Sequence, residues 1–219
     1  MRTMRRATRR PRAGMTLIEV LLAGSVMAVI LGAIATTALS GQKSAATNLA
    51  VNGLETEARR VVDRIAEELI QADSLGLAPV PAPPFGSSTL AYHRDTGFSG
   101  GAITWGPTTR LRFQYASGET NNGADDDSDG LADEGVLVFT TDVGLPTQRD
   151  IVWAHDVREF LQGETGNGLD DNGNGLIDEQ GLAFSLTGKT LTIRLTLERK
   201  DPKGKLLTKT VQTSVRIRN

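Results

Sequence analysis

The chain contains no cysteine and only two histidines among its 219 residues. Without cysteine it can form no disulfide bond and cannot carry the lipidated cysteine of a lipoprotein. His93 and His155 belong to no catalytic motif, and the sequence lacks G-x-S-x-G, H-E-x-x-H and glycine-rich phosphate-loop patterns. Gly97–Gly101 is glycine-rich but follows no clear strand, so we expect a loop there. These absences favour a protein that is not an enzyme.

Charge is almost missing from residues 15–42, where Glu19 is the only charged side chain. A helix needs about 20 apolar residues to cross a bilayer, so this stretch is long enough to span one. A carboxylate inside a span costs about 2.5–3.5 kcal/mol at the helix centre, so it is normally retained for a partner or a function. The stretch predicts a single transmembrane helix in which Glu19 has such a role.

Acidic residues are absent from the first 14 positions, which instead hold six arginines: Arg2, Arg5, Arg6, Arg9, Arg10 and Arg12. Positive charge beside a span stays in the cytoplasm, so the N-terminus should be cytoplasmic and the C-terminal part should lie across the inner membrane. Without these six arginines the chain has 18 Lys and Arg against 26 Asp and Glu, a formal net charge of −8. That charge disfavours nucleic acid as a partner.

The string Gly14-Met-Thr-Leu-Ile-Glu19 resembles the N-terminal motif of the type IV pilin-like proteins. In that family a short basic leader ends in glycine, and glutamate is the fifth residue after the cut. The resemblance implies that a prepilin peptidase cleaves after Gly14, that Met15 becomes N-methylated, and that Glu19 acts in assembly. It also implies three further partners, namely other pilin-like subunits that bind through the N-terminal helix, an inner-membrane assembly platform and the lipid bilayer. The family usually has phenylalanine where this chain has Met15.

Two other kinds of N-terminal segment are alternatives. A secretory signal peptide has an apolar core of 7–15 residues before a small-residue cleavage site, which Ala38-Leu-Ser40 before Gly41 could imitate. The apolar run is too long for that class, and Glu19 lies inside it. A plain signal anchor explains the length of the run but not the motif around Gly14.

Beyond Gln42 the helical pattern continues with apolar residues three or four positions apart: Leu54, Ala58, Val61, Val62, Ile65 and Leu69. Most of the remaining positions are charged, and Glu55 with Arg59 forms a favourable i, i+4 pair. One helix is therefore expected from Met15 to about Ala72. It contains four glycines, which could be close-packing sites or points of bending: Gly24, Gly32, Gly41 and Gly53.

The proline-rich stretch Leu77–Phe85 should end the helix, and the chain after it has the pattern of β structure. Strands are expected at Thr109–Tyr115, Val136–Phe139, Ile151–Trp153, Leu191–Leu197 and Val211–Ile217, with a turn at Asp201–Gly204 joining the last two. The expected fold is α+β and pilin-like, with a long N-terminal helix packed on an antiparallel sheet. The expected segments are a cleaved leader (1–14), a transmembrane and assembly helix (15–42), its amphipathic continuation (43–76) and an extracytoplasmic β-rich domain (77–219).

Within the pilin-like group, size and helix length resemble the J-type minor pseudopilins of type II secretion, or the related W-type minor pilins. The resemblance implies a non-catalytic subunit that helps to initiate or cap a filament used in protein export. A minor pilin of a type IV pilus is one alternative. A membrane-anchored, calcium-dependent binding or enzymatic domain is another.

An acidic motif occurs twice, in residues 122–135 and again 45 positions later in residues 167–181. Both copies fit D-x-[DN]-x-[DN]-G-x-x-D, which resembles the first nine positions of an EF-hand calcium loop. The glutamate expected at the twelfth position is replaced by Val136 and Gly181, so Glu134 and Glu179 are expected to complete the two sites. The other expected ligands are Asp125, Asp127, Asp129, the Leu131 carbonyl and Asp133 in the first loop, and Asp170, Asn172, Asn174, the Leu176 carbonyl and Asp178 in the second.

The balance of charge around the first loop also points to a cation. No Lys or Arg occurs between Arg112 and Arg149, although eight acidic residues lie there. These carboxylates would repel one another without a counter-ion, so we expect one or two calcium ions in the two loops. Magnesium fits less well, because it prefers to keep its waters. The alternative is a solvated loop rich in turn-forming residues that binds no metal.

Overall fold

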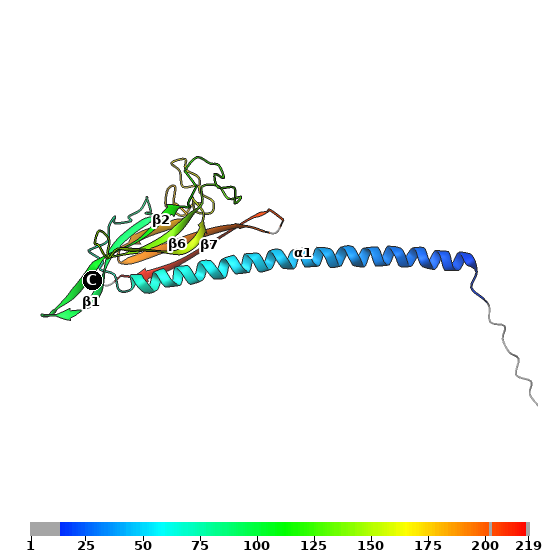
Figure 1. Cartoon of the computed structure of the whole chain (residues 1–219), viewed down its shortest axis with the longest axis horizontal. Coiled ribbons are helices and arrows are strands. Elements are labelled where there is room, and N and C mark those ends of the chain that lie inside the picture. The colour runs from blue at the N-terminus through cyan, green and yellow to red at the C-terminus, as the bar shows by residue number, and fades with distance from the viewer. Residues whose placement is uncertain (1–13, 202, 218–219) are drawn as a thin grey trace, which may run out of the picture. The chain divides into compact units, whose positions relative to one another are not determined.

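A computed structural model describes residues 14–201 and 203–217 (Figure 1). The predicted leader therefore lies outside the described residues up to position 13. One helix is followed by seven strands: α1 (Leu17–Leu69), β1 (Thr89–Ser99), β2 (Ala102–Tyr115), β3 (Gly135–Thr141), β4 (Arg149–Val157), β5 (Leu182–Thr187), β6 (Thr190–Lys200) and β7 (Leu206–Arg216). This is the predicted α+β layout of a long N-terminal helix and an antiparallel sheet.

The chain divides into two compact units between Ala46 and Thr47. The described part of the first unit is almost entirely helical, and every side chain from Gly14 to Ala46 is exposed. The most apolar 18-residue window of α1 has a mean hydropathy of 2.4, so this helix is a candidate membrane span by length and composition. The helix is not interrupted at its four glycines, and a Cβ added at any of them would meet no other atom of the chain.

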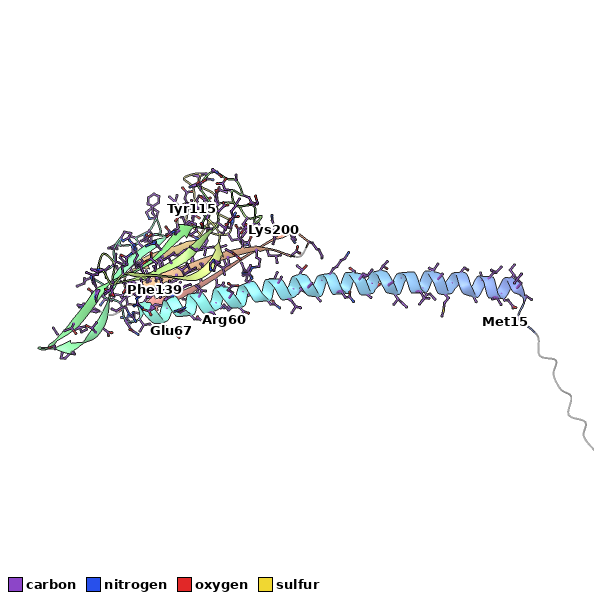
Figure 2. The ribbon with its side chains drawn as sticks, in the orientation of Figure 1. Met15, Arg60, Glu67, Tyr115, Phe139 and Lys200 are labelled. Carbon is purple, nitrogen blue, oxygen red and sulfur yellow. The ribbon has the colours of Figure 1, made fainter. Side chains whose placement is uncertain are left out.

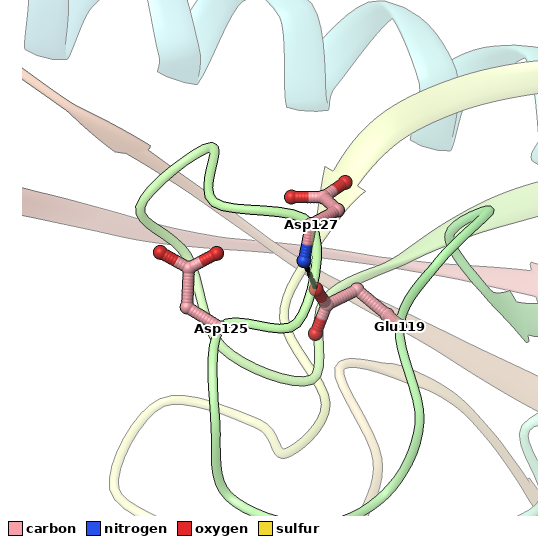
Figure 3. Close-up of side chains that lie close together, drawn as sticks. All are labelled: Glu119, Asp125 and Asp127. Carbon is pink, nitrogen blue, oxygen red and sulfur yellow. Dashed lines mark hydrogen bonds between the residues drawn. The ribbon is translucent and has the colours of Figure 1, made fainter.

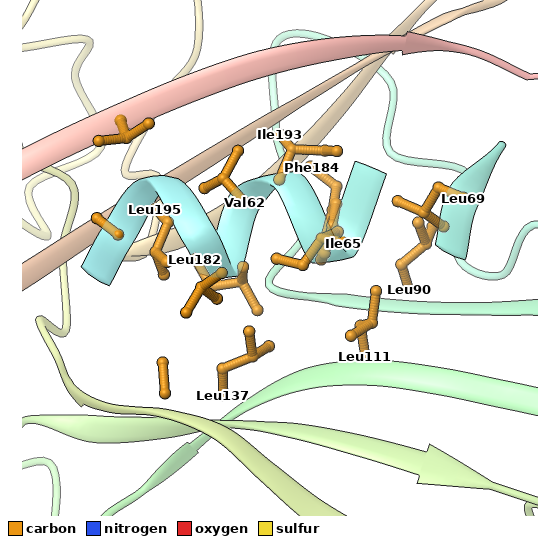
Figure 4. Close-up of a cluster of buried hydrophobic side chains, with 14 of the residues drawn as sticks. Val62, Ile65, Leu69, Leu90, Leu111, Leu137, Leu182, Phe184, Ile193 and Leu195 are labelled. Atoms are coloured by element: carbon orange, nitrogen blue, oxygen red, sulfur yellow. The ribbon is translucent and has the colours of Figure 1, made fainter. Parts of the chain in front are cut away.

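The second unit begins with the remaining turns of α1, which pack on the sheet through one face. The buried residues are those predicted from the periodicity: Leu54, Ala58, Val61, Val62, Ile65 and Leu69. They form one core with sheet residues such as Leu90, Leu111 and Phe184 (Figure 4). Burying each large aliphatic side chain contributes about 1.5–3 kcal/mol, so this contact is a main source of the unit's stability. The polar face, including Arg60 and Glu67, is exposed (Figure 2).

The helix ends at Leu69, three residues before the predicted end. The chain turns there because Ala72 forms a β-bridge with Arg94 and the Asp73 N–H donates to the His93 carbonyl oxygen. Pairing with the edge of β1 thus replaces the last predicted helical turn. The predicted Glu55–Arg59 pair is confirmed at 2.7 Å, and Glu55 also lies 2.8 Å from Lys209 on β7.

The strands form one antiparallel sheet in the order β1-β2-β3-β4-β6-β5, with β7 paired to β6. One ladder pair, Val157–Leu197, joins β4 to β6, and an ion pair between Arg199 and Asp156 at 3.0 Å also crosses this seam. A bridge between Ser87 and Phe184 connects the segment before β1 to β5, and the sheet therefore curls. The two Asp-rich segments both lie at this curled sheet, one between β2 and β3 and the other between β4 and β5.

All five predicted strands are present, within longer strands in most cases. The predicted terminal hairpin is confirmed, and its turn is closed by the Gly204 N–H, which donates to the Asp201 carbonyl oxygen at 2.8 Å. Two strands were not predicted, β1 and β5. The expected loop at Gly97–Gly101 is wrong in part, because β1 continues to Ser99 and only Gly100 and Gly101 form the turn into β2. Pairing with β2 supplies the hydrogen bonds that hold this glycine-containing segment extended.

Candidate metal centre in the paired acidic loops

The two acidic segments have the same local fold, which explains the repeat. In the first, both carboxylate oxygens of Asp133 accept hydrogen bonds from backbone N–H groups, from Asn122 at 3.0 Å and from Gly123 at 2.7 Å. In the second, Asp178 accepts from Asn167 and Gly168 at 3.0 and 2.9 Å. These aspartates close the loops, so the structure gives two of the predicted metal ligands a structural role.

A glutamate that was not among the predicted ligands organises each loop from outside the motif. Glu119 accepts three backbone N–H groups, from Asp126 at 2.8 Å, Asp127 at 2.9 Å and Asp133 at 3.0 Å. Glu164 accepts the N–H of Asn172 at 2.9 Å in the same way. The two glutamates are also 45 positions apart, and each is followed by threonine. Extending the repeat three residues upstream of Asn122 would have identified them.

The first loop brings five carboxylates into two overlapping groups. Glu119, Asp125 and Asp127 form one, and Asp127, Asp129 and Glu134 form the other; in each group three oxygens lie within 4.8 Å of one another. Figure 3 shows the first group, including the bond from the Asp127 N–H to Glu119. Because both Glu119 oxygens already accept backbone N–H groups, this residue has less capacity left for a metal ion.

Glu134 differs from Glu119 in that no other residue in the described part of the chain donates a hydrogen bond to its carboxylate. The residue is 2 % exposed, and both of its side-chain oxygens are buried without a hydrogen-bond donor. Burial, together with the negative charges of Asp129, Glu119 and Asp127, raises the pKa of Glu134 to about 7, although its own backbone N–H acts to lower it. A buried, unpaired carboxylate is costly. A divalent cation between Asp127, Asp129 and Glu134 would supply the missing partner.

The second loop holds a weaker version of this arrangement. Asn174 replaces Asp129, and its amide donates to Glu179 at 2.6 Å. Asp170 accepts the N–H groups of Gly173, Asn174 and Gly175, so its carboxylate is already occupied. One buried oxygen of Glu179 and one of Glu164 still lack a donor. Among the described residues no group of three acidic ligand atoms forms here, as one does in the first loop.

The predicted backbone ligands, Leu131 and Leu176, also anchor the loops to the domain. Their side chains are buried, and their N–H groups donate to Asp129 and Asn174 at 2.8 and 2.9 Å. Each loop therefore turns inward at its leucine and carries the following acidic residues toward the sheet. This local geometry agrees with the order [DN]-x-[DN]-G-L, which both copies of the repeat share.

Neighbouring strands contribute further charges to the first loop. The side chain of Lys200, from the end of β6, lies so close to Gly130 that a Cβ on that glycine would overlap it. Glu198, also on β6, is buried beside Arg158 at 3.5 Å, and burial raises its pKa. The loop thus has one lysine nearby as a counter-charge, which the spacing of charges along the sequence did not indicate.

A hydrogen bond links the bases of the two loops. Tyr115 ends β2 just before the first loop, and its hydroxyl donates to Glu159, which precedes the second, at 2.9 Å. Burial, followed by this bond and the nearby carboxylates, raises the pKa of Tyr115 to about 12. The two loops are therefore neighbours in the folded domain as well as repeats in the sequence.

At the N-terminal end of α1, Glu19 takes part in a local cap. Its carboxylate accepts the backbone N–H of Thr16 at 2.8 Å and the Thr16 hydroxyl at 2.9 Å, while the Glu19 N–H donates back to that hydroxyl at 3.4 Å. This is the reciprocal arrangement of a capping box. Gly14 and Met15 precede the helix and are exposed. Glu19 thus has a partner within its own chain, which sequence reasoning missed.

The two histidines lie apart in the sheet. Nε2 of His93 on β1 is 3.2 Å from the Thr108 hydroxyl on β2, and His155 is an exposed residue of β4. Comparison with known proteins gives no further assignment: no protein-family model matches the chain, and neither a curated protein nor a solved structure is similar enough to match.

Proposed function

We propose that this chain is a non-catalytic, pilin-like filament subunit, a minor pseudopilin of a type II secretion system that helps to initiate or cap the pseudopilus. The observation that carries the proposal is α1 itself. Its first half is exposed and apolar, it begins at the Gly14–Glu19 motif, and its second half packs on an antiparallel sheet. A minor pilin of a type IV pilus has the same features and is the nearest alternative.

On this proposal the helix lies in the inner membrane with the N-terminus in the cytoplasm and the β-rich domain outside. The prepilin peptidase removes the leader, and the apolar half of α1 then binds the helices of other pilin-like subunits. Glu19 pairs with the Met15 amine of a neighbouring subunit, because a carboxylate in lipid needs a cation. The bond to Thr16 competes with this pairing and would be exchanged for it on assembly.

Two variants at this helix end test the proposal against a purely local role. Glu19→Gln removes the charge, whereas Thr16→Val removes the capping hydroxyl and keeps the charge. If Glu19 pairs with a neighbour, cross-linking to partner pilins should be lost in Glu19→Gln and kept in Thr16→Val. Equal loss in both variants, or no loss in Glu19→Gln, would show that the carboxylate serves only as a cap.

We further propose that the first loop binds one calcium ion through Asp127, Asp129 and Glu134, and that the second binds calcium more weakly. The buried, unpaired carboxylate of Glu134 carries this proposal. Calcium fits better than magnesium because calcium takes six to eight oxygen ligands, carboxylates among them, whereas magnesium usually keeps several of its waters. A ligand that binds only the folded state stabilises it by about 2.7 kcal/mol at a hundredfold excess over Kd.

Thermal melts of the detergent-solubilised chain in chelator and in calcium test the calcium site. Equal melting temperatures in the two conditions, with no heat of binding in calorimetry, would exclude a metal.

The two loops also favour a second candidate function, a membrane-anchored domain that binds a ligand through calcium. Genes for a secretion ATPase, a secretin and other short pilin-like proteins beside this one would support the filament subunit. The Glu19→Gln chain, which should not assemble, separates the two candidates. If it shows an activity or binds a ligand only when calcium is present, the anchored domain is supported.

A further inference from the structure

The ribbon formed by the ends of β1 and β2 extends past the rest of the sheet as a two-stranded arm, residues 96–107 (Figure 1). Two register shifts between His93 and Gly97 separate the arm from the body of the sheet. Such bulges bend and twist a strand pair, which sets the arm off from its neighbours. Nearly all of the arm is exposed.

The outer edge of β1 is covered by another segment only as far as the base of the arm. Ala78 pairs with Ala91, Ala72 pairs with Arg94, and the Asp95 N–H donates to the Gln71 carbonyl oxygen. Apart from β2, no described segment pairs with β1 beyond Asp95. Thr96–Ser99 is therefore a short free strand edge, whose outward-facing backbone N–H and C=O groups, those of alternate residues, are available to another strand.

The side chains of the arm are apolar on one face. Phe98 pairs with Ile103 across the ribbon, and Trp105 lies two residues along on the same strand, so the three share a face. Their exposed fractions are 73, 41 and 36 %. No charged residue occurs between Asp95 and Arg110. Edge strands that must stay unpaired usually carry a lysine or proline, and Thr96–Ser99 has neither.

Insertion into lipid fits the arm poorly, because an open two-stranded ribbon would bring unpaired backbone groups into hydrocarbon. A protein strand satisfies those groups. A free antiparallel edge is complementary to itself under a two-fold rotation, and an uncharged edge places no like charges opposite each other. We propose that the arm is a docking strand for a second copy of this chain, with Thr96–Ser99 of the two copies paired antiparallel and their apolar faces side by side on one face of a four-stranded ribbon.

The arm is too small to hold two free molecules together, since a stable interface buries roughly 800 Å² on each partner. Pairing therefore depends on chains that are already concentrated by the membrane helix, where the second contact becomes effectively intramolecular. The inference rests in this respect on the proposed membrane anchorage and filament assembly.

Single cysteines test the pairing, and the natural chain has none to interfere. Each residue from Thr96 to Ser99 is replaced by cysteine in turn in the full chain, and the membranes are oxidised. One position, or two adjacent ones, should give a disulfide-linked dimer, because only the residues near the two-fold axis bring their Cβ atoms close enough. Thr187→Cys, at the exposed end of another strand, is the matched control and should give none.

Gly32→Cys, on the exposed helix, separates this inference from the proposed function. Cross-links through Gly32→Cys without any through positions 96–99 would overturn the arm pairing and leave the filament proposal standing. Cross-links through the arm but not through Gly32→Cys would support the pairing and leave the filament proposal to the Glu19→Gln test, because that proposal places other pilin-like subunits beside α1. If the introduced thiols at 96–99 form no dimer but are shielded from a water-soluble maleimide, lipid or a different protein covers the arm, and pairing between copies is wrong.

Discussion

Glu134 and Glu119 should respond in opposite directions to the same substitution. Both are buried glutamates of the first loop, but Glu119 accepts three backbone N–H groups and Glu134 accepts none on its side chain. In the metal-free chain at pH 8, Glu134→Gln should raise the free energy of unfolding, because it removes an unpaired buried charge. Glu119→Gln should lower it by about 1–3 kcal/mol, because one of the two accepting oxygens becomes an NH2 group and leaves a backbone donor without an acceptor.

The size of the Glu134 effect follows from its pKa. Its pKa rises from 4.5 to about 7 on folding, and each unit corresponds to about 1.4 kcal/mol, so ionisation opposes folding by about 3 kcal/mol. The folded chain holds this proton more tightly than the unfolded chain, and stability without metal should therefore fall as pH rises from 4.5 to 7 and level off above that. Glu134→Gln should remove this fall and raise the melting temperature at pH 8 by roughly 6–12 °C.

Thermal melts in chelator between pH 4.5 and 8, repeated with calcium, would measure both effects. Calcium should stabilise the parent most above pH 7, where Glu134 no longer competes for a proton, and its effect should be much smaller in Glu134→Gln. Glu179→Gln, at the equivalent position of the second loop, is the matched control and should change the calcium response less. If Glu134→Gln lowers stability at pH 8 in chelator, the carboxylate has a protein partner and our reasoning about the site fails.

Three further predictions concern other parts of the chain. Asp129→Asn should lower the calcium affinity of the first loop about tenfold, and Asn174→Asp should raise that of the second; calorimetry that finds both affinities unchanged would exclude these positions as ligands. Gly14→Leu should leave an uncut precursor in the membrane, whereas a parent protein whose mature N-terminus is not Met15 would exclude prepilin-type processing. Ile65→Ala should cost about 2–5 kcal/mol because this fully buried side chain packs between α1 and the sheet; urea unfolding measures it, and a cost under 1 kcal/mol would mean that α1 contributes little to the domain.

Periodicity along the sequence was enough to determine which face of α1 is buried, because spacings of three and four place Leu54, Ile65 and Leu69 on one side of any helix. Alternation and turn residues determined the terminal hairpin in the same way. β1 and β5 were not predictable on this basis. β1 carries charged and glycine residues along its length, and β5 is short, so each depends on hydrogen bonds from a neighbouring strand that only the folded chain provides.

The acidic repeat likewise determined by itself where a cation could bind, since alternate oxygens and a glycine at the turn are local features. Only the tertiary structure decided what each carboxylate does. Asp133 and Glu119 accept backbone N–H groups, whereas Glu134 is buried without a donor and Lys200 arrives from the far end of β6. These roles differ because burial and hydrogen-bond partners come from segments distant in sequence, and spacing within a motif carries no information about them.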